Sequence, residues 1–191
     1  MNKYERTALQ HMQEFDLFCA ILKKRDVQSY LEIGSKHGGS LWRAANSLKV
    51  GSRIVSVDLP HGDTSFKETE PNLRACVDHL KRLGYDAHLF LGDSTSPEII
   101  NKVRALGPFE ACFIDANHTI PYVTRDWENY GPMCQLVAFH DINFKRPEGW
   151  AQTTKKMPIE VPQFWDSIKG NYKHQEIRLD QQDNGIGILW R

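Results

Sequence analysis

Two aspartates, Asp115 and Asp141, have the positions in this chain that are best suited to chemistry. Each ends a short hydrophobic run, residues 109–115 and 135–141, of the kind that forms a buried parallel strand. In an open α/β sheet, ligands bind in the crevice beyond the carboxyl ends of the strands. Carboxylates at two such ends are therefore better placed to act on a ligand than to stabilise the fold.

Two histidines accompany these acids. If the two strands are neighbours, roughly 4.8 Å apart, Asp115 and the pair His140–Asp141 can converge on one divalent cation such as Mg²⁺. Imidazole suits Zn²⁺, Fe²⁺ or Mn²⁺ better than Mg²⁺, so the pattern leaves open whether His140 is a ligand. His118, just past Asp115, is a candidate general base near neutral pH. The alternative for His118 is a histidine that is hydrogen-bonded within its loop.

A glycine-rich turn, Gly34-Ser-Lys-His-Gly-Gly-Ser40, lies between an expected strand and an expected helix. Glycine lets the backbone turn sharply and approach a ligand, and the start of a helix offers free backbone N–H groups. The turn lacks the dinucleotide pattern Gly-x-Gly-x-x-Gly, because residue 36 is Lys. An ordinary strand-to-helix turn is the alternative.

Two further strand ends carry polar groups. Asp58 follows Gly34 by 24 positions, close to the interval of about 20 at which a carboxylate accepts the ribose hydroxyls of a nucleotide. A capping aspartate is the alternative there. Asp93 and Ser94 can place a carboxylate and a hydroxyl beside an adenine edge, or they can cap the helix that begins near Pro97.

The bulk properties exclude several classes of protein. A chain of 191 residues fits one domain, residues 1–191, and equal numbers of basic and acidic residues, 24 each, provide no electrostatic footprint for nucleic acid or an anionic membrane. No apolar run approaches the roughly 20 residues of a membrane-spanning helix. Four scattered cysteines are expected to be buried, reduced thiols of a cytoplasmic protein: Cys19, Cys76, Cys112 and Cys134.

Strands and helices are expected to alternate along the chain, which predicts a parallel sheet covered by helices on both faces. The expected strands are residues 29–34, 53–58, 86–93, 109–115 and 135–141, followed by a closing hairpin of residues 174–179 and 185–190. The expected helices are residues 4–24, within an amino-terminal helical segment 1–25, then 40–48, 72–83, a helix from residue 97, 122–130 and 164–169.

Two long irregular segments are expected, residues 61–71 and 143–162. The second is long enough to be a functional loop, and we expect it to be an active-site lid. Aromatic residues in or beside it can cover a substrate, although Phe164 and Trp165 are better explained by packing of the short helix against the core. These aromatic residues are Phe144, Trp150, Phe164 and Trp165.

Five motifs together resemble the class I S-adenosylmethionine-dependent methyltransferases, in particular the branch with the cephalosporin hydroxylase-like, rhamnosyl and macrocin O-methyltransferases. The motifs are Leu31–Ser40, Val57-Asp58, Gly92-Asp-Ser94, Phe113–His118 and Ala138–Ile142. The resemblance implies a Rossmann-like three-layer α/β sandwich. Its seven-stranded, mostly parallel sheet would have the order 3-2-1-4-5-7-6, with the last strand antiparallel.

The resemblance also implies roles for matching residues. In S-adenosylmethionine binding, Glu32, Gly34 and Ser40 would surround the methionine part, Asp58 would hold the ribose, and Asp93 and Ser94 would face the adenine. Asp115 would contact the cofactor, would be a metal ligand together with His140 and Asp141, and would be a catalytic residue with His118, which would be the base. Metal-dependent catechol-type relatives have Asp-Asn where this chain has His140–Asp141, a departure that bears on metal dependence.

The resulting hypothesis is a methyltransferase that methylates an oxygen of a small hydroxylated acceptor, with a divalent metal as a candidate aid. Nucleic acid and membranes are not expected partners, and the oligomeric state, a homodimer included, stays open. One alternative is a module that binds S-adenosylmethionine or a nucleotide on the same fold and catalyses nothing. Another is a nucleotide-sugar or NAD enzyme, against which the missing Gly-x-Gly-x-x-Gly weighs.

Overall fold

The computed structural model describes residues 10–60, 69–144, 158–179 and 184–191, and one sheet contains all the strands of these ranges. The strands are β1 Ser29–Ile33, β2 Arg53–Asp58, β3 Asp86–Leu91, β4 Phe109–Ile114, β5 Cys134–His140, β6 Lys173–Ile177 and β7 Ile186–Trp190. The helices are α1 Met12–Lys24, α2 Gly39–Asn46, α3 Thr69–Arg82, α4 Pro97–Arg104, α5 Ile120–Tyr130 and α6 Val161–Ile168, with short 3-10 helices η2 Gly131–Met133 and η3 Lys169–Asn171.

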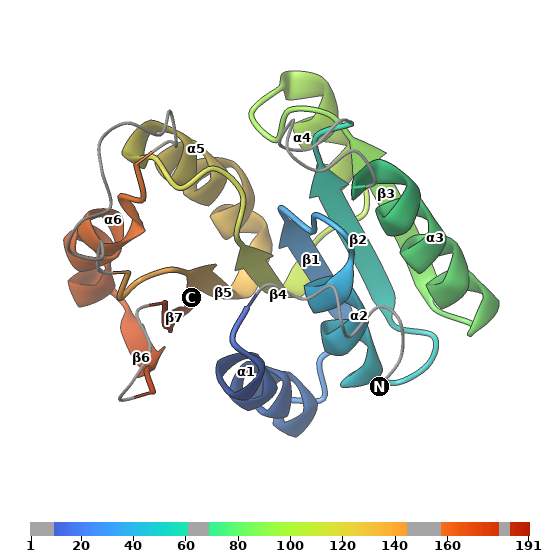
Figure 1. Cartoon of the computed structure of the whole chain (residues 1–191), viewed down its shortest axis with the longest axis horizontal. Coiled ribbons are helices and arrows are strands. Elements are labelled where there is room, and N and C mark those ends of the chain that lie inside the picture. The colour runs from blue at the N-terminus through green and yellow to red at the C-terminus, as the bar shows by residue number, and fades with distance from the viewer. Residues whose placement is uncertain (1–9, 61–68, 145–157, 180–183) are drawn as a thin grey trace.

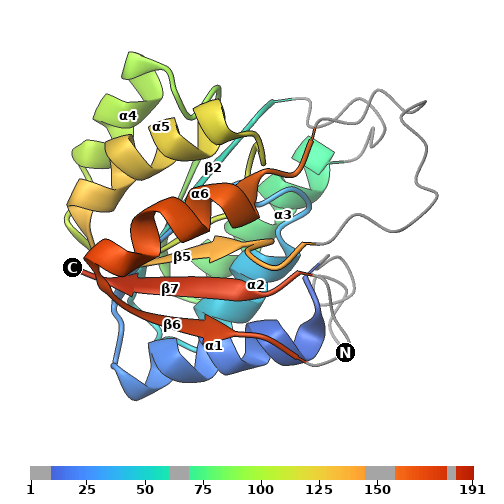
Figure 2. The ribbon, with the colours of Figure 1, turned by 90° about the vertical axis from the view of Figure 1, so that its left-hand side faces the viewer.

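The sheet has the order β3-β2-β1-β4-β5-β7-β6, as the resemblance implied. Strands β1 to β5 pair in parallel, whereas β7 is antiparallel to both of its neighbours, β5 and β6. Figure 1 shows this order across the molecule, and Figure 2 shows β5, β7 and β6 side by side, between α6 on one face and α1 on the other. The expected fold class is confirmed.

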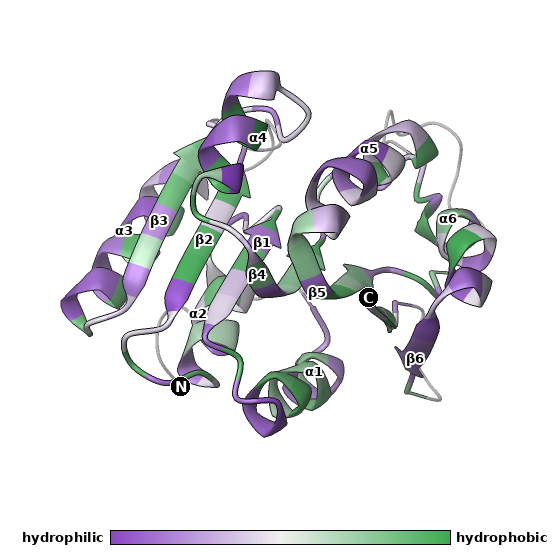
Figure 3. Ribbon diagram, turned by 180° about the vertical axis from the view of Figure 1, so that it is seen from behind, coloured by the Kyte–Doolittle hydropathy of each residue, from purple (hydrophilic) through white to green (hydrophobic). Residues whose placement is uncertain are grey.

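Each face of the sheet has its own hydrophobic core. Residues of α1, α2 and α3 pack on one face, around Phe113, and residues of α4, α5 and α6 pack on the other, around Phe139. Strands covered on both faces become almost continuously apolar, which is why β4 and β5 read so clearly in the sequence. The edge strand β6 is largely exposed and hydrophilic, and appears purple in Figure 3.

Three helices begin earlier than expected, and each has a proline in its first turn. Pro71, Pro121 and Pro162 lie close to the starts of α3, α5 and α6, where a proline lacks only an N–H that would have no helical partner anyway. Residues 69–71 and 161–162 were expected to be irregular, and that expectation is wrong for both segments.

The first helix differs in the opposite direction. It begins at Met12, and Gln10 and His11 are not helical. The expectation of a continuous helix from residue 4 is therefore wrong at its start. Residues 1–9, most of the expected loop 61–71, most of the expected lid with Trp150, and the hairpin tip 180–183 lie outside the described residues. Phe164 and Trp165 are buried in the core, as expected, and all four cysteines are buried and free.

Within the described ranges, no helix is long and apolar enough to cross a lipid bilayer.

Candidate active site

A cavity of about 760 Å³ lies at the carboxyl ends of the parallel strands. Its size falls in the range usual for small-molecule sites, about 300–1,000 Å³. Of the residues to which the sequence gave a cofactor, metal or catalytic role, Glu32 alone does not line it. Those that do are Gly34, Ser40, Asp58, Asp93, Ser94, Asp115, His118, His140 and Asp141. Strand tips far apart in the sequence therefore meet in one cavity, as the parallel sheet predicted.

The glycine turn needs glycine at its first position. Gly34 has φ +89°, and a Cβ there would lie 2.6 Å from the carbonyl carbon of Asp115 and 2.7 Å from Cα of Ala116. The backbone at the end of β4 thus passes directly against the end of β1, where Asp115 N–H donates to Ile33 O at 2.9 Å. Gly38, with φ +84°, then precedes α2, whose first turn lines the cavity.

Asp58 lies at the end of β2 beside this turn. Its Oδ2 accepts a hydrogen bond from the backbone N–H of Lys36 at 2.5 Å, and its Oδ1 accepts one from Leu59 at 2.7 Å. Burial raises the pKa of Asp58, although the backbone hydrogen bonds act in the other direction. Each carboxylate oxygen keeps a second lone pair, so Asp58 remains able to accept two hydroxyl groups from the cavity side.

Glu32 lies behind the cavity wall instead of in it. Its carboxylate is fully buried and accepts hydrogen bonds from Ser40 Oγ at 2.8 Å and from the Tyr30 hydroxyl at 2.7 Å. Burial raises the pKa of Glu32 to about 7, against the opposing effect of these two hydrogen bonds. Glu32 therefore orients Ser40, which does line the cavity.

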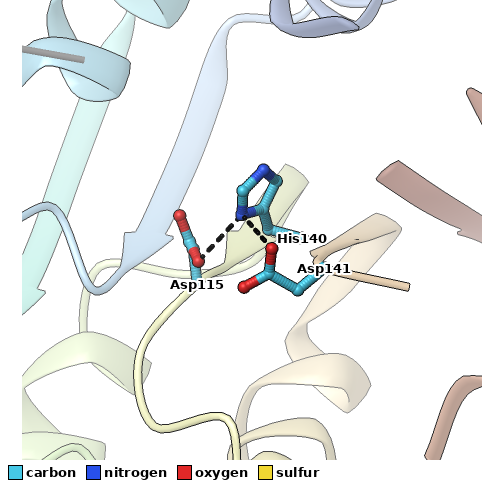
Figure 4. Close-up of side chains that lie close together, drawn as sticks. All are labelled: Asp115, His140 and Asp141. Carbon is cyan, nitrogen blue, oxygen red and sulfur yellow. Dashed lines mark ion pairs between the residues drawn. The ribbon is translucent and has the colours of Figure 1, made fainter. Parts of the chain in front are cut away.

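Asp115, His118, His140 and Asp141 form a compact cluster at the tips of β4 and β5. Asp115 Oδ1 lies 3.1 Å from Nε2 of His118 and 3.3 Å from Nδ1 of His140. Asp141 lies 3.3 Å from each of the same two imidazole nitrogens. Figure 4 shows the side chains of Asp115, His140 and Asp141 pointing toward one another. The predicted convergence of the two strand ends is present.

The cluster is mostly buried, and its members shift one another's protonation. Burial alone would raise the pKa of Asp115, but the charge of His140 and the hydrogen bond from His118 outweigh it and lower that pKa. Burial opposes protonation of His140, yet the charge of Asp115 raises its pKa to about 9. His118 remains the most exposed member, with 30% of its side chain accessible, and is the one that a ligand can reach most easily.

Asp141 also has an unusual backbone, with φ +60° in a residue other than glycine. Such conformations cost free energy and concentrate at functional sites. The carboxylates of Asp141 and Asp115 both contact the imidazoles of His118 and His140, so they face one volume.

Comparison with known families decides the class of protein. The family described as a methyltransferase domain matches residues 31–142, from β1 to the end of β5. This match covers more than half of the chain. The chain belongs to this methyltransferase family. The matched segment contains every residue to which the sequence gave a cofactor, metal or catalytic role, and the family argues against the alternative of a nucleotide-sugar or NAD enzyme.

Two solved structures have the same fold as this methyltransferase. An O-methyltransferase from Bacillus cereus, in complex with S-adenosylhomocysteine (SAH), has a TM-score of 0.68 at 14% identity, over 95% of this chain and 82% of its own. TomG, an O-methyltransferase from Streptomyces achromogenes in complex with S-adenosylmethionine (SAM), has a TM-score of 0.68 at 16% identity, over 100% and 90%. No curated protein sequence matches the chain significantly.

The methyltransferase has a donor set that fits a divalent cation. One atom each of Asp115, His140 and Asp141 lies within 4.8 Å of the others. Two carboxylates with one imidazole suit Mn²⁺, Fe²⁺ or Zn²⁺ at least as well as Mg²⁺. The narrower branch named from the sequence, and the role of each residue, stay predictions.

Several cavity residues were missed from the sequence, and Gln10 among them contacts the cluster directly. Gln10 precedes α1, is almost fully buried, and donates a hydrogen bond from Nε2 to Asp115 Oδ2 at 2.5 Å. These two residues are 105 positions apart, and nothing in the local pattern around Gln10 marks it. Only the packing of the amino-terminal segment of the methyltransferase across the strand tips brings it into the site.

Proposed function

We propose that this methyltransferase transfers a methyl group from SAM to an oxygen of a small hydroxylated acceptor. The observation that carries the proposal is one cavity with two chemically different ends. The glycine turn and Asp58 form one end, and the cluster of Asp115, His118 and Asp141 forms the other. O-methyltransferases of the same fold bound to SAM and SAH support it.

The cofactor would lie along the tips of β1, β2 and β3. Asp58 would accept the two ribose hydroxyls, and Asp93 with Ser94 would face the adenine. Gly34 and Ser40 would contact the methionine part, with Glu32 orienting Ser40 from behind. The absence of a side chain at Gly34 lets the end of β1 lie against the Asp115 backbone, and this contact shapes the cavity wall beside the methionine part.

Bound SAM supplies an electrophilic methyl group on a sulfonium ion. His118 would accept the proton of the acceptor hydroxyl on Nδ1, because its Nε2 already donates to Asp115, and the oxygen would then attack in line with the carbon–sulfur bond. Asp115 and Asp141 both lie within 3.3 Å of Nε2 and would orient the imidazole and stabilise its charge after proton transfer. Most of the catalytic effect would come from positioning and electrostatic stabilisation.

A divalent cation, where bound, would be held by Asp115, His140 and Asp141. It would supply positive charge that favours the ionised form of the acceptor oxygen. In the structure, His140 Nδ1 lies 3.3 Å from both Asp115 and Asp141, and a bound cation would replace these ion pairs.

Substitution of the base tests the proposal. We expect His118→Ala to lower methyl transfer to a panel of catechols, phenols and sugars about 100-fold or more, the usual contribution of a general base. His88→Ala is the matched control, since His88 also pairs with an aspartate, Asp86, at 2.7 Å, but does not line the cavity. Wild-type turnover in His118→Ala and Asp115→Ala would refute the assignment. Tight SAM binding without turnover on any acceptor would favour the non-catalytic module instead.

The neutral charge and the small cavity favour a small-molecule acceptor over nucleic acid. A cytoplasmic location belongs to the same proposal, and fractionation of the native host would test it.

A further inference from the structure

Ser94 is held by two residues of α5. Its hydroxyl donates a hydrogen bond to Asp126 Oδ1 at 2.7 Å, and its carbonyl oxygen accepts one from the Tyr130 hydroxyl at 2.6 Å. Asp126 and Tyr130 are four residues apart and therefore share one face of the helix. Since Ser94 lines the cavity, the hydroxyl and the backbone of one cavity residue are positioned by separate partners.

Burial of the Asp126 carboxylate costs folding free energy. Its side chain is fully buried, and among the described residues its second oxygen, Oδ2, has no hydrogen-bond partner. Burial raises the pKa of Asp126 to about 7, the hydrogen bond from Ser94 lowers it, and the charge of Asp93 raises it. A single hydrogen bond does not offset the burial of a carboxylate, and perturbed acids of this kind concentrate at functional sites. The effect of Asp126 on Ser94 explains the residue better than stability does.

Asp126 decides whether the Ser94 hydroxyl donates or accepts a hydrogen bond on the cavity side. A serine hydroxyl has one hydrogen to donate and two lone pairs to accept with. Ionised Asp126 can only accept, so it takes the hydrogen and leaves the lone pairs for the cavity. Ser94 then accepts a hydrogen bond from a ligand but cannot donate one. A 6-amino purine presents a donor at this edge, whereas a 6-oxo purine presents an acceptor.

We infer that Asp126 is a positioning residue that makes Ser94 select a 6-amino purine over a 6-oxo purine. The inference rests on the proposed function, in which the base of the cofactor lies beside Ser94. The layout of the cavity supports this placement. The cluster around Asp115 lies at the tips of β4 and β5, and Asp58 lies at the tip of β2. The nucleoside end of the ligand therefore extends away from the cluster, toward β3.

Calorimetry with two nucleosides tests the inference on the full chain. The probes are SAH and S-inosyl-L-homocysteine, which carries a 6-oxo group in place of the 6-amino group. A buffer of about pH 8.5 keeps Asp126 ionised. We expect the wild type to bind SAH at least about tenfold more tightly than S-inosyl-L-homocysteine. SAH gains a hydrogen bond to Ser94, whereas the 6-oxo group leaves an acceptor unpaired. We expect Asp126→Ala to reduce this preference about tenfold, because the freed hydroxyl can then turn and donate to the 6-oxo group.

Three variants separate positioning from a general structural effect. Tyr130→Phe removes only the hold on the Ser94 backbone, so both affinities should fall by one factor and the preference should persist. Asp126→Asn keeps an oxygen that can accept the same hydrogen bond, so it should retain the preference within about twofold. Ser94→Ala should lower the preference about as much as Asp126→Ala does, and adding Asp126→Ala to it should change nothing more.

The outcomes are distinguishable. If Asp126→Ala does not fold, Asp126→Leu, which fills the volume without an acceptor, takes its place. A preference that is unchanged by the loss of the Asp126 acceptor, or unchanged by Ser94→Ala, overturns the inference while SAH binding leaves the proposed function intact. A wild type that binds neither nucleoside overturns the proposed function and the inference with it.

Discussion

Replacement of Gly34 by alanine should damage both stability and cofactor binding. The added Cβ would meet the carbonyl oxygen of Asp115 and lie 2.6 Å from its carbonyl carbon. These are backbone atoms of a neighbouring strand end, fixed by the hydrogen bond from Asp115 N–H to Ile33 O. The positive φ costs about 1–2 kcal/mol in a residue with a Cβ, and forced overpacking adds about 1–3 kcal/mol, so the free energy of unfolding should fall by about 2–5 kcal/mol.

Gly51 provides a matched control. Its φ of +94° nearly equals the +89° of Gly34, but a Cβ on Gly51 would have no heavy atom within 4 Å. Gly51→Ala should therefore cost only the conformational part, about 1–2 kcal/mol. The difference between the two variants isolates the close approach of β1 and β4, and it should be about 1–3 kcal/mol.

Two measurements on both variants check this reasoning. Denaturant titration gives the free energies of unfolding, and calorimetry gives the affinity for SAH. Gly34→Ala should weaken SAH binding at least about tenfold, because the displaced backbone moves the cavity wall, whereas Gly51→Ala, outside the cavity, should bind as the wild type does. Equal loss of stability in the two variants, or undiminished SAH binding by Gly34→Ala, refutes the reasoning.

Three further predictions concern other parts of the molecule. Burial raises the pKa of Glu32 from 4.5 to about 7, so the folded state holds this proton more tightly than the unfolded state. The free energy of unfolding should therefore fall by about 3 kcal/mol as the pH rises from 4.5 to about 7. Glu32→Gln should remove this part of the slope when the free energy of unfolding is measured at several pH values, and an unchanged slope would contradict it. Trp165 is fully buried and donates from Nε1 to Glu176 at 2.6 Å, so Trp165→Ala should cost about 3–5 kcal/mol in denaturant titration, and Trp165→Phe clearly less. If a cation assists catalysis, EDTA should lower turnover at least about tenfold without weakening SAH binding, and Mn²⁺ should restore it; turnover that EDTA leaves unchanged would remove the metal from the proposal.

The strand tips were predictable from the sequence because a parallel sheet has a strong physical signature. Strands buried on both faces produce continuous apolar runs, and their carboxyl ends meet at one edge whatever their separation along the chain. Asp58, Asp115 and Asp141 could therefore be assigned to one crevice before their coordinates were known. The hydrophobic pattern alone did not supply the strand order, which came from the resemblance to a family.

The starts of the helices, and the residues that support the site from behind, were harder to predict from the sequence. Proline was read as ending irregular segments at positions 71 and 162, although the first turn of a helix tolerates it. Gln10 and Asp126 contact the site across 105 and 32 positions of sequence, respectively. Contacts of this kind depend on how helices pack over the strand tips, which no local periodicity encodes. Glu32 shows the same limit, since an acid at a strand end can face the core as readily as the crevice.

The strand order also explains why the cavity has two chemically different ends. From β1 the chain proceeds outward through β2 and β3, then returns to place β4 on the other side of β1, so the connections diverge at the β1–β4 boundary. Such a switch point opens the crevice in which ligands bind. Asp58 and Ser94 lie on one side of it and Asp141 on the other, and Gly34 contacts Asp115 across the boundary itself. In the proposed function, the methyl group would pass from a donor on the β2 side to an acceptor on the β5 side at this boundary, where a side chain on Gly34 would displace the Asp115 backbone that forms it.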